Sequence, residues 1–148
     1  MMPAFISHSH DDGGIYSTLC LALDAAKLSR WDPTTMSSGK SLGEQLRDAI
    51  HECYACVFVA TRNSIASRWC LAEAGAFWGA GKRIILFMGE SGLTDTDLPP
   101  QFKGSLWTSD AGRLMTELAN ASQIVAPRAL DRPANFFWLG HDLERDEG

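Results

Sequence analysis

The stretch ACVFVATRNS, residues 55–64, decides the fold of this chain. Its first six residues form a continuous apolar run, which is typical of a central parallel strand that helices cover on both faces. A strand with one solvated face would instead alternate apolar and polar residues. Four polar residues follow, at the point where the strand gives way to the next element. The stretch therefore predicts a buried strand over residues 55–60 at the centre of an α/β domain.

The residues before this strand predict a strand, a helix and a second, short strand. Residues 4–8 form the first strand, and the polar turn 9–13 provides an N-cap for the helix that follows. A short strand is expected over residues 28–31, and residues 32–40 have loop composition throughout. The first helix carries one apolar stripe, formed by Ile15, Leu19, Ala22, Leu23 and Ala26.

A second helix is expected to begin at a capping box. Ser41 and Glu44 have the S-x-x-E spacing, in which the two side chains satisfy backbone N–H groups at the start of a helix. This helix leads directly to the central strand. Its side chains that are expected to point inward are Leu42, Leu46, Ile50 and Cys53.

The chain beyond residue 64 continues the alternation of helices and strands. A third helix ends at Gly79, and residues 83–88 form another buried strand. After a loop rich in glycine, aspartate and proline, a weak strand is expected around residues 106–107. The third helix contains Trp69, Ala72, Glu73, Ala76 and Phe77, and a last helix, capped by Asp110, directs Leu114, Leu118 and Ala121 inward.

This alternation predicts one α/β domain with a mainly parallel five-stranded sheet flanked by helices. We assign residues 1–125 to the domain. Residues 126–148 do not continue the pattern and form a C-terminal tail or the start of a linker or downstream segment. The aromatic residues within 134–143 could pack on the domain, start another helix or contact a partner, and these alternatives stay open.

The composition excludes several classes of partner. The 148 residues carry a formal net charge of -5 and no cluster of Lys and Arg, so we expect no direct contact with nucleic acid. The apolar runs are far shorter than the roughly 20 residues that span a bilayer, and the N-terminus does not have the pattern of a signal peptide. We expect a cytoplasmic protein that makes no contact with a membrane.

The four cysteines are expected to be buried thiols. Cys53 and Cys56 have a C-x-x-C spacing, but here a helix precedes a strand, which is the reverse of the usual redox arrangement. No second Cys or His pair completes a zinc site, and His8 and His10 have no carboxylate at a ligand spacing. We expect no metal.

The parallel sheet itself selects candidate site residues, because ligands bind at the carboxyl ends of parallel strands. This rule selects the loops at residues 8–13, 32–40 and 61–69. His8 and His10 in the first loop could contact a substrate or titrate near neutral pH. In the second loop, Lys40 could contact a diphosphate or be solvated, and Asp32 could bind ribose hydroxyls or cap a turn.

Three segments resemble the Toll/interleukin-1 receptor (TIR) domain family. The segment Phe5-Ile6-Ser7-His8-Ser9 is similar to the first-strand box of that family, and Asp32 with Ser38-Gly39-Lys40-Ser41 resembles its BB loop. The most specific match is Ser64-x-x-Ser67-x-Trp69-Cys70-x-x-Glu73. The three segments occur in the family's order between residues 4 and 88. Ser38-Gly39 stands where many members have Pro-Gly, a departure that concerns substrate contacts more than the fold.

The resemblance implies a flavodoxin-like TIR fold and, for the bacterial type of TIR NADase, cleavage of NAD+ with no separate cofactor. It assigns to Glu73 the role of catalytic carboxylate, which binds the ribose hydroxyls and stabilises the developing cation. The residues expected to bind the substrate, from the resemblance and from their place in the loops, are Ser7, His8, Ser9, His10, Asp32, Ser38, Gly39, Lys40 and Trp69.

The chemistry of this bond explains how one carboxylate could suffice. Nicotinamide leaves as a neutral molecule, so no general acid is required, unlike in ordinary glycoside hydrolysis. The enzyme has to hold the ribose and stabilise an oxocarbenium-like transition state with a negative charge. Glu73 lies four residues after Trp69 and shares its helix face, so an indole would flank the carboxylate. The spacing alone favours the alternative of a half-buried core tryptophan beside a solvated or ion-paired glutamate.

By the same resemblance, the reaction would give nicotinamide and either ADP-ribose or a cyclic ADP-ribose isomer, in bacterial antiphage defence or immune signalling. Copies would assemble through TIR–TIR contacts of the loop 32–41, with an activating partner or a downstream domain as the trigger. Two alternatives stay open at this point. One is a non-enzymatic TIR–TIR adaptor module, and the other is an enzyme similar to nucleoside deoxyribosyltransferases.

Overall fold

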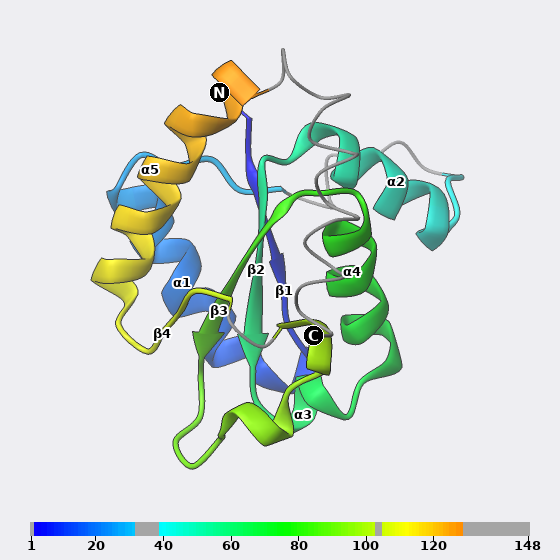
Figure 1. Cartoon of the computed structure of the whole chain (residues 1–148), viewed down its shortest axis with the longest axis vertical. Helices are drawn as coiled ribbons and strands as arrows, with labels where there is room; N and C mark the ends of the chain where they lie inside the picture. Colours follow the sequence, from blue (N-terminus) through cyan, green and yellow to red (C-terminus); the bar gives the residue numbers. More distant parts are fainter. Residues whose placement is uncertain (1, 32–38, 103–104, 129–148) are drawn as a thin grey trace.

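The computed structural model describes residues 2–31, 39–102 and 105–128, and it shows a parallel sheet between two layers of helices (Figure 1). The four strands lie in the order β1-β2-β3-β4, and every neighbouring pair is parallel. In the register of the sheet, Ser7 pairs with Phe58 and Phe58 pairs with Leu86. The strands are β1 (Ala4–Ser7), β2 (Ala55–Ala60), β3 (Arg83–Met88) and β4 (Trp107–Thr108).

The expected strand over residues 28–31 is reduced to a single bridge. The Ala4 N–H donates to Ser29 O at 2.9 Å, the Trp31 N–H donates to Ala4 O at 2.8 Å, and Arg30 forms an isolated parallel bridge with Ala4. Both polar backbone groups of Ala4 are used on this side, so the segment lies on the edge of β1 away from β2. The order of a flavodoxin-like sheet is retained, and residues 2–31, 39–102 and 105–128 contain four strands instead of the expected five.

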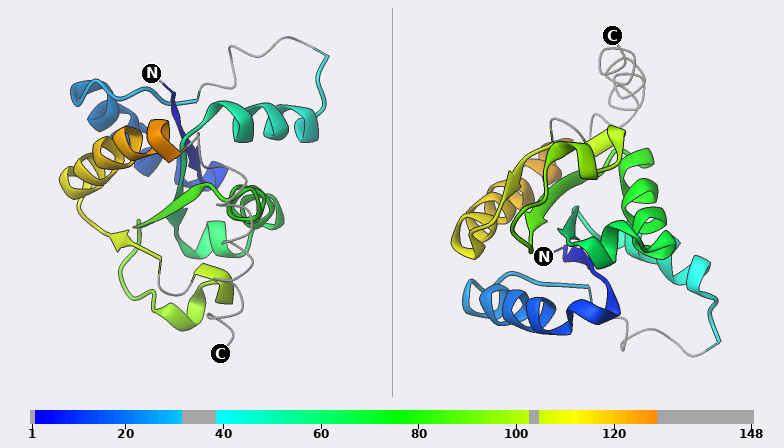
Figure 2. Two further views of the ribbon diagram at one scale, coloured as in Figure 1. Left: turned by 45° about the horizontal axis from the view of Figure 1, so that its top comes forward. Right: turned by 90° about the horizontal axis from the view of Figure 1, so that it is seen from below.

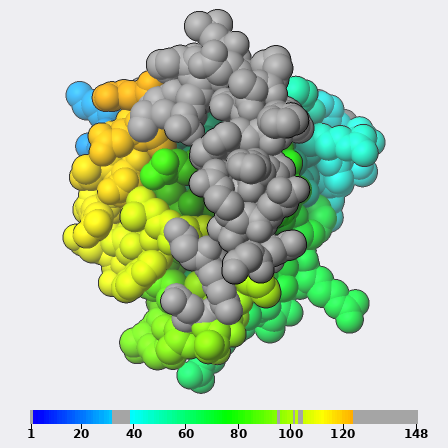
Figure 3. Space-filling view, viewed as in Figure 1, coloured from blue at the N-terminus to red at the C-terminus, as the bar shows by residue number. Residues whose placement is uncertain are grey.

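The helices cover the two faces of the sheet in pairs. Helices α1 and α5 lie on one face, and α2 and α4 lie on the other (Figures 1 and 2). The space-filling view shows α5 in yellow to orange and α2 in cyan on opposite sides of the molecule (Figure 3). The helices are α1 (Gly13–Ala25), α2 (Leu42–Glu52), α3 (Arg62–Ile65), α4 (Arg68–Gly79) and α5 (Ala111–Arg128), with 3-10 turns at His10–Asp12, Asp95–Asp97 and Pro100–Phe102.

The central strand is buried along its whole length, as its sequence predicts. All six residues of β2 are buried, and they alternate between two apolar clusters. On the first face, the inward positions of α1 and α5 pack on the strands, and Leu114, Leu118 and Ala121 are buried as predicted. On the second face, Phe77 of α4 and Ala49 of α2 pack against Phe58. The four cysteines are all buried.

The second helix begins as predicted but directs one residue differently. Ser41 is its N-cap, and the Ser41 side chain accepts from the Glu44 N–H at 3.1 Å. The prediction that Leu42 points inward is wrong, because the residue is 64% exposed. It occupies the first position of α2, whereas Ala49, about two turns later on the same helix face, is buried. Leu46 and Ile50 are partly buried against the second cluster.

The segment between β2 and Gly79 is divided into two helices. Thr61 and Ser64 form a capping box that starts the short helix α3, and Ser67 then caps α4 by accepting from the Cys70 N–H at 3.2 Å. The expected single helix is therefore preceded by a separate helical turn, because two cap residues follow each other within one stretch.

The last helix extends past the expected end of the domain. Helix α5 runs to Arg128, so it crosses residue 125. The aromatic tail segment, residues 134–143, lies outside the described residues. Within the described part of the chain, no helix combines the length and apolar character that crossing a membrane requires.

Candidate active site

A cavity of about 630 Å³ opens at the carboxyl ends of β1 and β2. This is the edge of the sheet at which the sequence predicts a site, and the described residues of the predicted loops 8–13 and 61–69 contribute to it. The walls come from β1 and the turn after it, from α1, from Trp31, from α2 and from the segment that leads into α4. The lining residues are Phe5, Ile6, His8, Ser9, His10, Asp11, Tyr16, Trp31, Leu42, Gln45, Leu46, Asn63, Ser67, Trp69, Cys70 and Glu73.

Glu73 lies in the wall of this cavity and is buried. Its side chain is on α4, which packs across β1 and β2, and only 9% of the residue is exposed. The hydroxyl of Ser7, the last residue of β1, donates to Glu73 Oε1 at 3.0 Å. A helix and a strand that are distant in the sequence therefore hold this carboxylate in place.

The surroundings of Glu73 change its acidity. Burial raises the pKa of the Glu73 carboxyl from 4.5 to about 7, because the charged form loses its hydration. Interactions with Ser7 and Trp69 oppose this effect and favour the carboxylate. A carboxyl group that titrates near neutral pH inside a cavity is a feature of functional sites.

Trp69 lies one turn before Glu73 and shares the cavity wall with it. The residue is 41% exposed, which is high for a tryptophan that also lines a cavity. The spacing prediction that Trp69 and Glu73 share a helix face is confirmed by their common place in the cavity wall. An exposed indole beside a buried carboxylate offers a flat surface for an aromatic ring next to a negative charge.

The turn after β1 contributes two histidines and a serine. The His8 ring stacks on Tyr16 with 3.9 Å between the ring centroids and an angle of 10° between the planes. His8 Nδ1 lies 3.2 Å from Ile6 O, which accepts its hydrogen bond, and burial lowers the pKa of His8 below its ordinary value of 6.5. Ser9 caps the following turn by accepting from the Asp11 N–H at 3.2 Å. Ser9 and His10 both line the cavity.

The predicted residues of the loop before α2 are only partly described. Gly39 has a φ of 99°, a left-handed conformation that favours glycine, and Lys40 is exposed. Lys40 forms an ion pair with Asp48 of α2, which raises the pKa of the lysine. Asp32 and Ser38, also predicted to bind the substrate, lie outside the described residues.

Several site residues were not predicted from the sequence. Leu42, Gln45 and Leu46 reach the cavity because α2 packs beside α4, which is a long-range contact that no local pattern reveals. Trp31 reaches it from the segment beside β1, where its N–H donates to Ala4 O. The mixture of apolar and polar side chains suits a ligand with flat rings and hydroxyl groups.

Asp12, also absent from the predicted set, connects two loops of the site. It is 9% exposed and accepts hydrogen bonds from Thr61 Oγ1 and, at 3.1 Å, from Asn63 Nδ2. The turn after β1 is thereby joined to the segment after β2. The acidic turn in which Asp12 lies was visible in the sequence, but its partners, about 50 residues away, were not.

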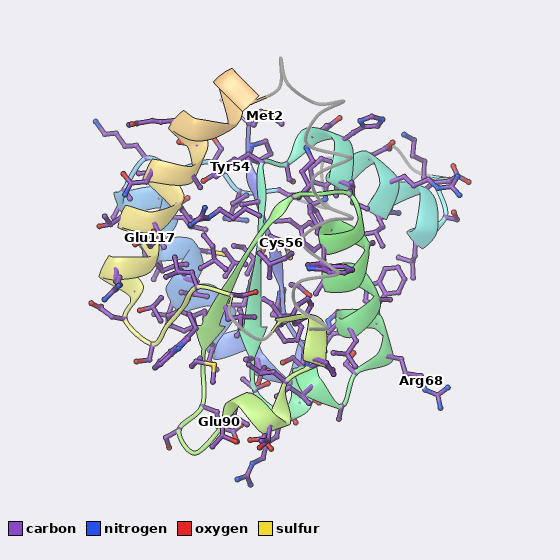
Figure 4. The ribbon with its side chains drawn as sticks, in the orientation of Figure 1. Met2, Tyr54, Cys56, Arg68, Glu90 and Glu117 are labelled. Atoms are coloured by element: carbon purple, nitrogen blue, oxygen red, sulfur yellow. The ribbon has the colours of Figure 1, made fainter. Side chains whose placement is uncertain are left out.

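Charges at the cavity are few. Among the described residues, the lining includes no Lys or Arg side chain, and Arg68 at the start of α4 points away from the body of the molecule (Figure 4). The described residues also contain no group of three His, Cys, Asp or Glu side chains that could hold a metal ion. The arrangement can bind a flat ring and place one carboxylate beside it.

Comparisons with known proteins agree with the fold. Among the solved structures similar to the chain are the TIR domain of the Toll-related receptor TRR-2 from Hydra magnipapillata (15% identity, 85% of this chain and 99% of that chain covered, TM-score 0.65), the Clostridium botulinum CMP N-glycosidase BcmB (18%, 79% and 97%, 0.55), and the TIR domains of the activated Roq1 resistosome (18%, 95% and 84%, 0.51). At these identities the likeness shows the fold alone. No curated protein matches the chain significantly.

The family model of the TIR domain matches residues 4–124. The match covers β1, the whole cavity wall as described, and most of α5. It also spans all three segments whose residues resemble the family. The chain belongs to the TIR domain family.

Proposed function

We propose that this TIR domain is an NAD+ glycohydrolase or cyclase that breaks the bond between nicotinamide and ribose, with Glu73 as the catalytic carboxylate. The observation that carries the proposal is the position of Glu73. Its carboxyl group lies in the wall of a 630 Å³ cavity, is held by Ser7 and titrates at a pKa of about 7. A solvated or ion-paired helix position would have none of these properties.

The cavity offers a role for each part of the substrate. The exposed part of Trp69 suits the face of a pyridinium ring, because a positively charged aromatic ring is attracted to the indole face. The carboxylate beside it stabilises the cation that develops on the ribose as nicotinamide leaves. His8, Ser9 and His10 at the end of β1 provide hydrogen-bonding groups for the rest of the nucleotide.

The bond that breaks is the one between the ribose C1′ and the pyridinium nitrogen. Its electron pair goes to the nitrogen, which becomes neutral, so no proton has to be supplied to the leaving group. Water or a nucleophilic atom of the adenine then attacks C1′, and the resulting proton is released. The first route gives ADP-ribose, and the second gives a cyclic isomer.

A second candidate function is cleavage of the N-glycosidic bond of a pyrimidine nucleotide. The observation that favours it is the structural similarity to the CMP N-glycosidase BcmB, which covers 79% of this chain. Cytosine is a poorer leaving group than nicotinamide unless it is protonated. In that reaction, a protonated Glu73 or a neighbouring histidine would have to act as a general acid.

The proposal also includes assembly of several copies as a condition for activity, together with an activating partner or a downstream domain as the trigger. The similarity to the TIR domains of the Roq1 resistosome supports this condition, as does the exposure of Gly39 and Lys40 before α2. The non-enzymatic adaptor module is the competing account, because a domain that only assembles needs no reactive cavity.

The test is the release of nicotinamide, measured by chromatography, from NAD+ incubated with the full chain at high protein concentration. We expect Glu73→Gln to lower the rate at least about 100-fold, since the charge that stabilises the transition state is lost. The matched control is Glu117→Gln on α5, on the other face of the sheet, which should change the rate less than about twofold (Figure 4).

The same samples separate the alternatives. Release of cytosine from CMP without release of nicotinamide from NAD+ would favour the second candidate. If neither compound is cleaved by assembled wild-type protein, the adaptor account replaces the enzyme. Chromatography of the remaining nucleotide distinguishes linear from cyclic ADP-ribose.

A further inference from the structure

We infer that Ser7 is a positioning residue for Glu73: its hydroxyl holds Oε1 so that the carboxylate presents its second oxygen to the substrate. The inference rests on the proposed function and changes the role of Ser7 from a substrate contact to a group that acts through Glu73. It also makes Ser7 responsible for keeping part of the Glu73 population charged.

The geometry of Ser7 supports this role. Ser7 is 1% exposed and does not line the cavity, although its neighbours on either side, Ile6 and His8, do. A buried hydroxyl in this position is poorly placed to reach a substrate. Its hydrogen bond to Glu73 Oε1 at 3.0 Å joins two residues that are 66 positions apart in the sequence.

The backbone around Ser7 is rigid. Ser7 is the last residue of β1, and its Cα partner is Phe58 in the buried central strand. Since both strands are packed between helices, the hydroxyl starts from a fixed point. A flexible loop residue could follow the carboxylate, whereas Ser7 constrains it. One oxygen of Glu73 is therefore anchored at the end of β1.

The hydrogen bond also affects the charge of Glu73. A hydroxyl that donates to a carboxylate stabilises the charged form, and Ser7 accordingly lowers the pKa that burial raises. Without the Ser7 hydroxyl, burial would be opposed mainly by Trp69. More of the carboxyl groups would then be protonated at neutral pH and unable to stabilise a cation.

The other titratable groups near Glu73 do not obscure a shift of the Glu73 pKa. The thiols of Cys56 on β2 and Cys70 on α4 interact with Glu73, and their pKa values are raised, so both stay neutral in the relevant range. His8 and His10 line the same cavity, and burial lowers the pKa of His8. A carbon-13 signal of the Glu73 carboxyl separates its titration from that of the histidines.

The experiment compares Ser7→Ala with wild type by NMR titration of the Glu73 carboxyl and by kcat/KM for NAD+ as a function of pH. A hydrogen bond to a charged group of this kind shifts a pKa by about one unit. We expect the Glu73 titration to move up by about one pH unit, and kcat/KM at pH 7 to fall about fivefold or more. Ser7→Thr, which keeps the hydroxyl, should restore the wild-type midpoint.

The matched control is Ser122→Ala on α5, which removes a serine hydroxyl bonded to Ala119 O at 2.8 Å, far from the cavity. It should leave the Glu73 titration unchanged. A merely structural role for Ser7 would lower the yield or the melting temperature without moving the midpoint.

The outcomes separate this inference from the proposed function. If Ser7→Ala folds and its Glu73 midpoint equals that of wild type, the inference is wrong, whether or not NAD+ is cleaved. If the midpoint moves but wild-type protein cleaves no NAD+, the contact between Ser7 and the carboxylate stands while the proposed function fails. Should Ser7→Ala not fold, the Ser7→Cys variant, with its weak donor, should show an intermediate upward shift.

Discussion

Two buried carboxyl groups in this domain, Asp12 and Glu73, have the same exposed fraction of 9% but different surroundings. Asp12 accepts from both Thr61 and Asn63, and it joins two loops. Glu73 accepts from Ser7 and faces a cavity of about 630 Å³. Burial alone therefore does not mark a reactive carboxyl group. A reactive carboxyl group is marked by burial together with access to a cavity.

The two carboxyl groups also differ in their effect on the stability of the protein. Asp12 is satisfied by the protein itself, so its contribution is to the stability and shape of the site. Burial raises the pKa of Glu73 to about 7 despite its hydrogen bonds with Ser7 and Trp69, so the folded protein is less stable when this carboxyl group is charged. This exchange of stability for reactivity is common in active sites.

The largest change in stability is expected from a substitution of Asp12. Asp12→Ala removes the acceptor of the buried Thr61 hydroxyl, and we expect the free energy of unfolding to fall by about 2–3 kcal/mol. Urea denaturation followed by circular dichroism measures this loss. Asp24→Ala, an exposed carboxylate on α1, is the control and should change the stability by less than about 0.5 kcal/mol. Equal effects of the two substitutions would show that the Asp12 hydrogen bonds do not stabilise the fold.

The opposite effect on stability is expected at Glu73. Because its folded pKa of about 7 lies above the ordinary value of 4.5, the folded state binds more protons between these pH values, and stability is lost as the pH rises from 4.5 through 7. Glu73→Gln removes this loss. We expect the variant to be more stable than wild type by about 1–2 kcal/mol at pH 8 and about equally stable at pH 4. Urea denaturation at the two pH values makes the comparison, and a destabilised variant at pH 8 would contradict it.

The sequence predicted the fold where local patterns were strong. The continuous apolar run of β2, the cap at Ser41 and the buried stripe of α5 were all correct, because each depends on neighbours along the chain. The strand at residues 28–31 and the inward position of Leu42 were not, because both depend on where the segment meets the edge of the sheet.

Prediction of the site from the sequence was limited in the same way. The rule that ligands bind at the carboxyl ends of parallel strands selected the loops that carry His8 and Trp69, and the spacing placed Trp69 and Glu73 together. The partners of Glu73 and Asp12 could not be predicted, since they lie about 50 to 66 positions away. Such contacts are set by packing, and no local periodicity reveals them.

We propose that the charged form of Glu73 does the chemistry, and burial raises the pKa of this carboxyl group to about 7. The measurement that tests this is kcat/KM for the release of nicotinamide from NAD+ between pH 5 and 9. Its pH dependence is compared with the NMR titration of the Glu73 carboxyl in the same protein. The account predicts that kcat/KM rises with pH, that its midpoint is about 7, and that it coincides with the Glu73 titration. Activity that is constant from pH 5.5 to 8, or a Glu73 midpoint near 4.5, would contradict it.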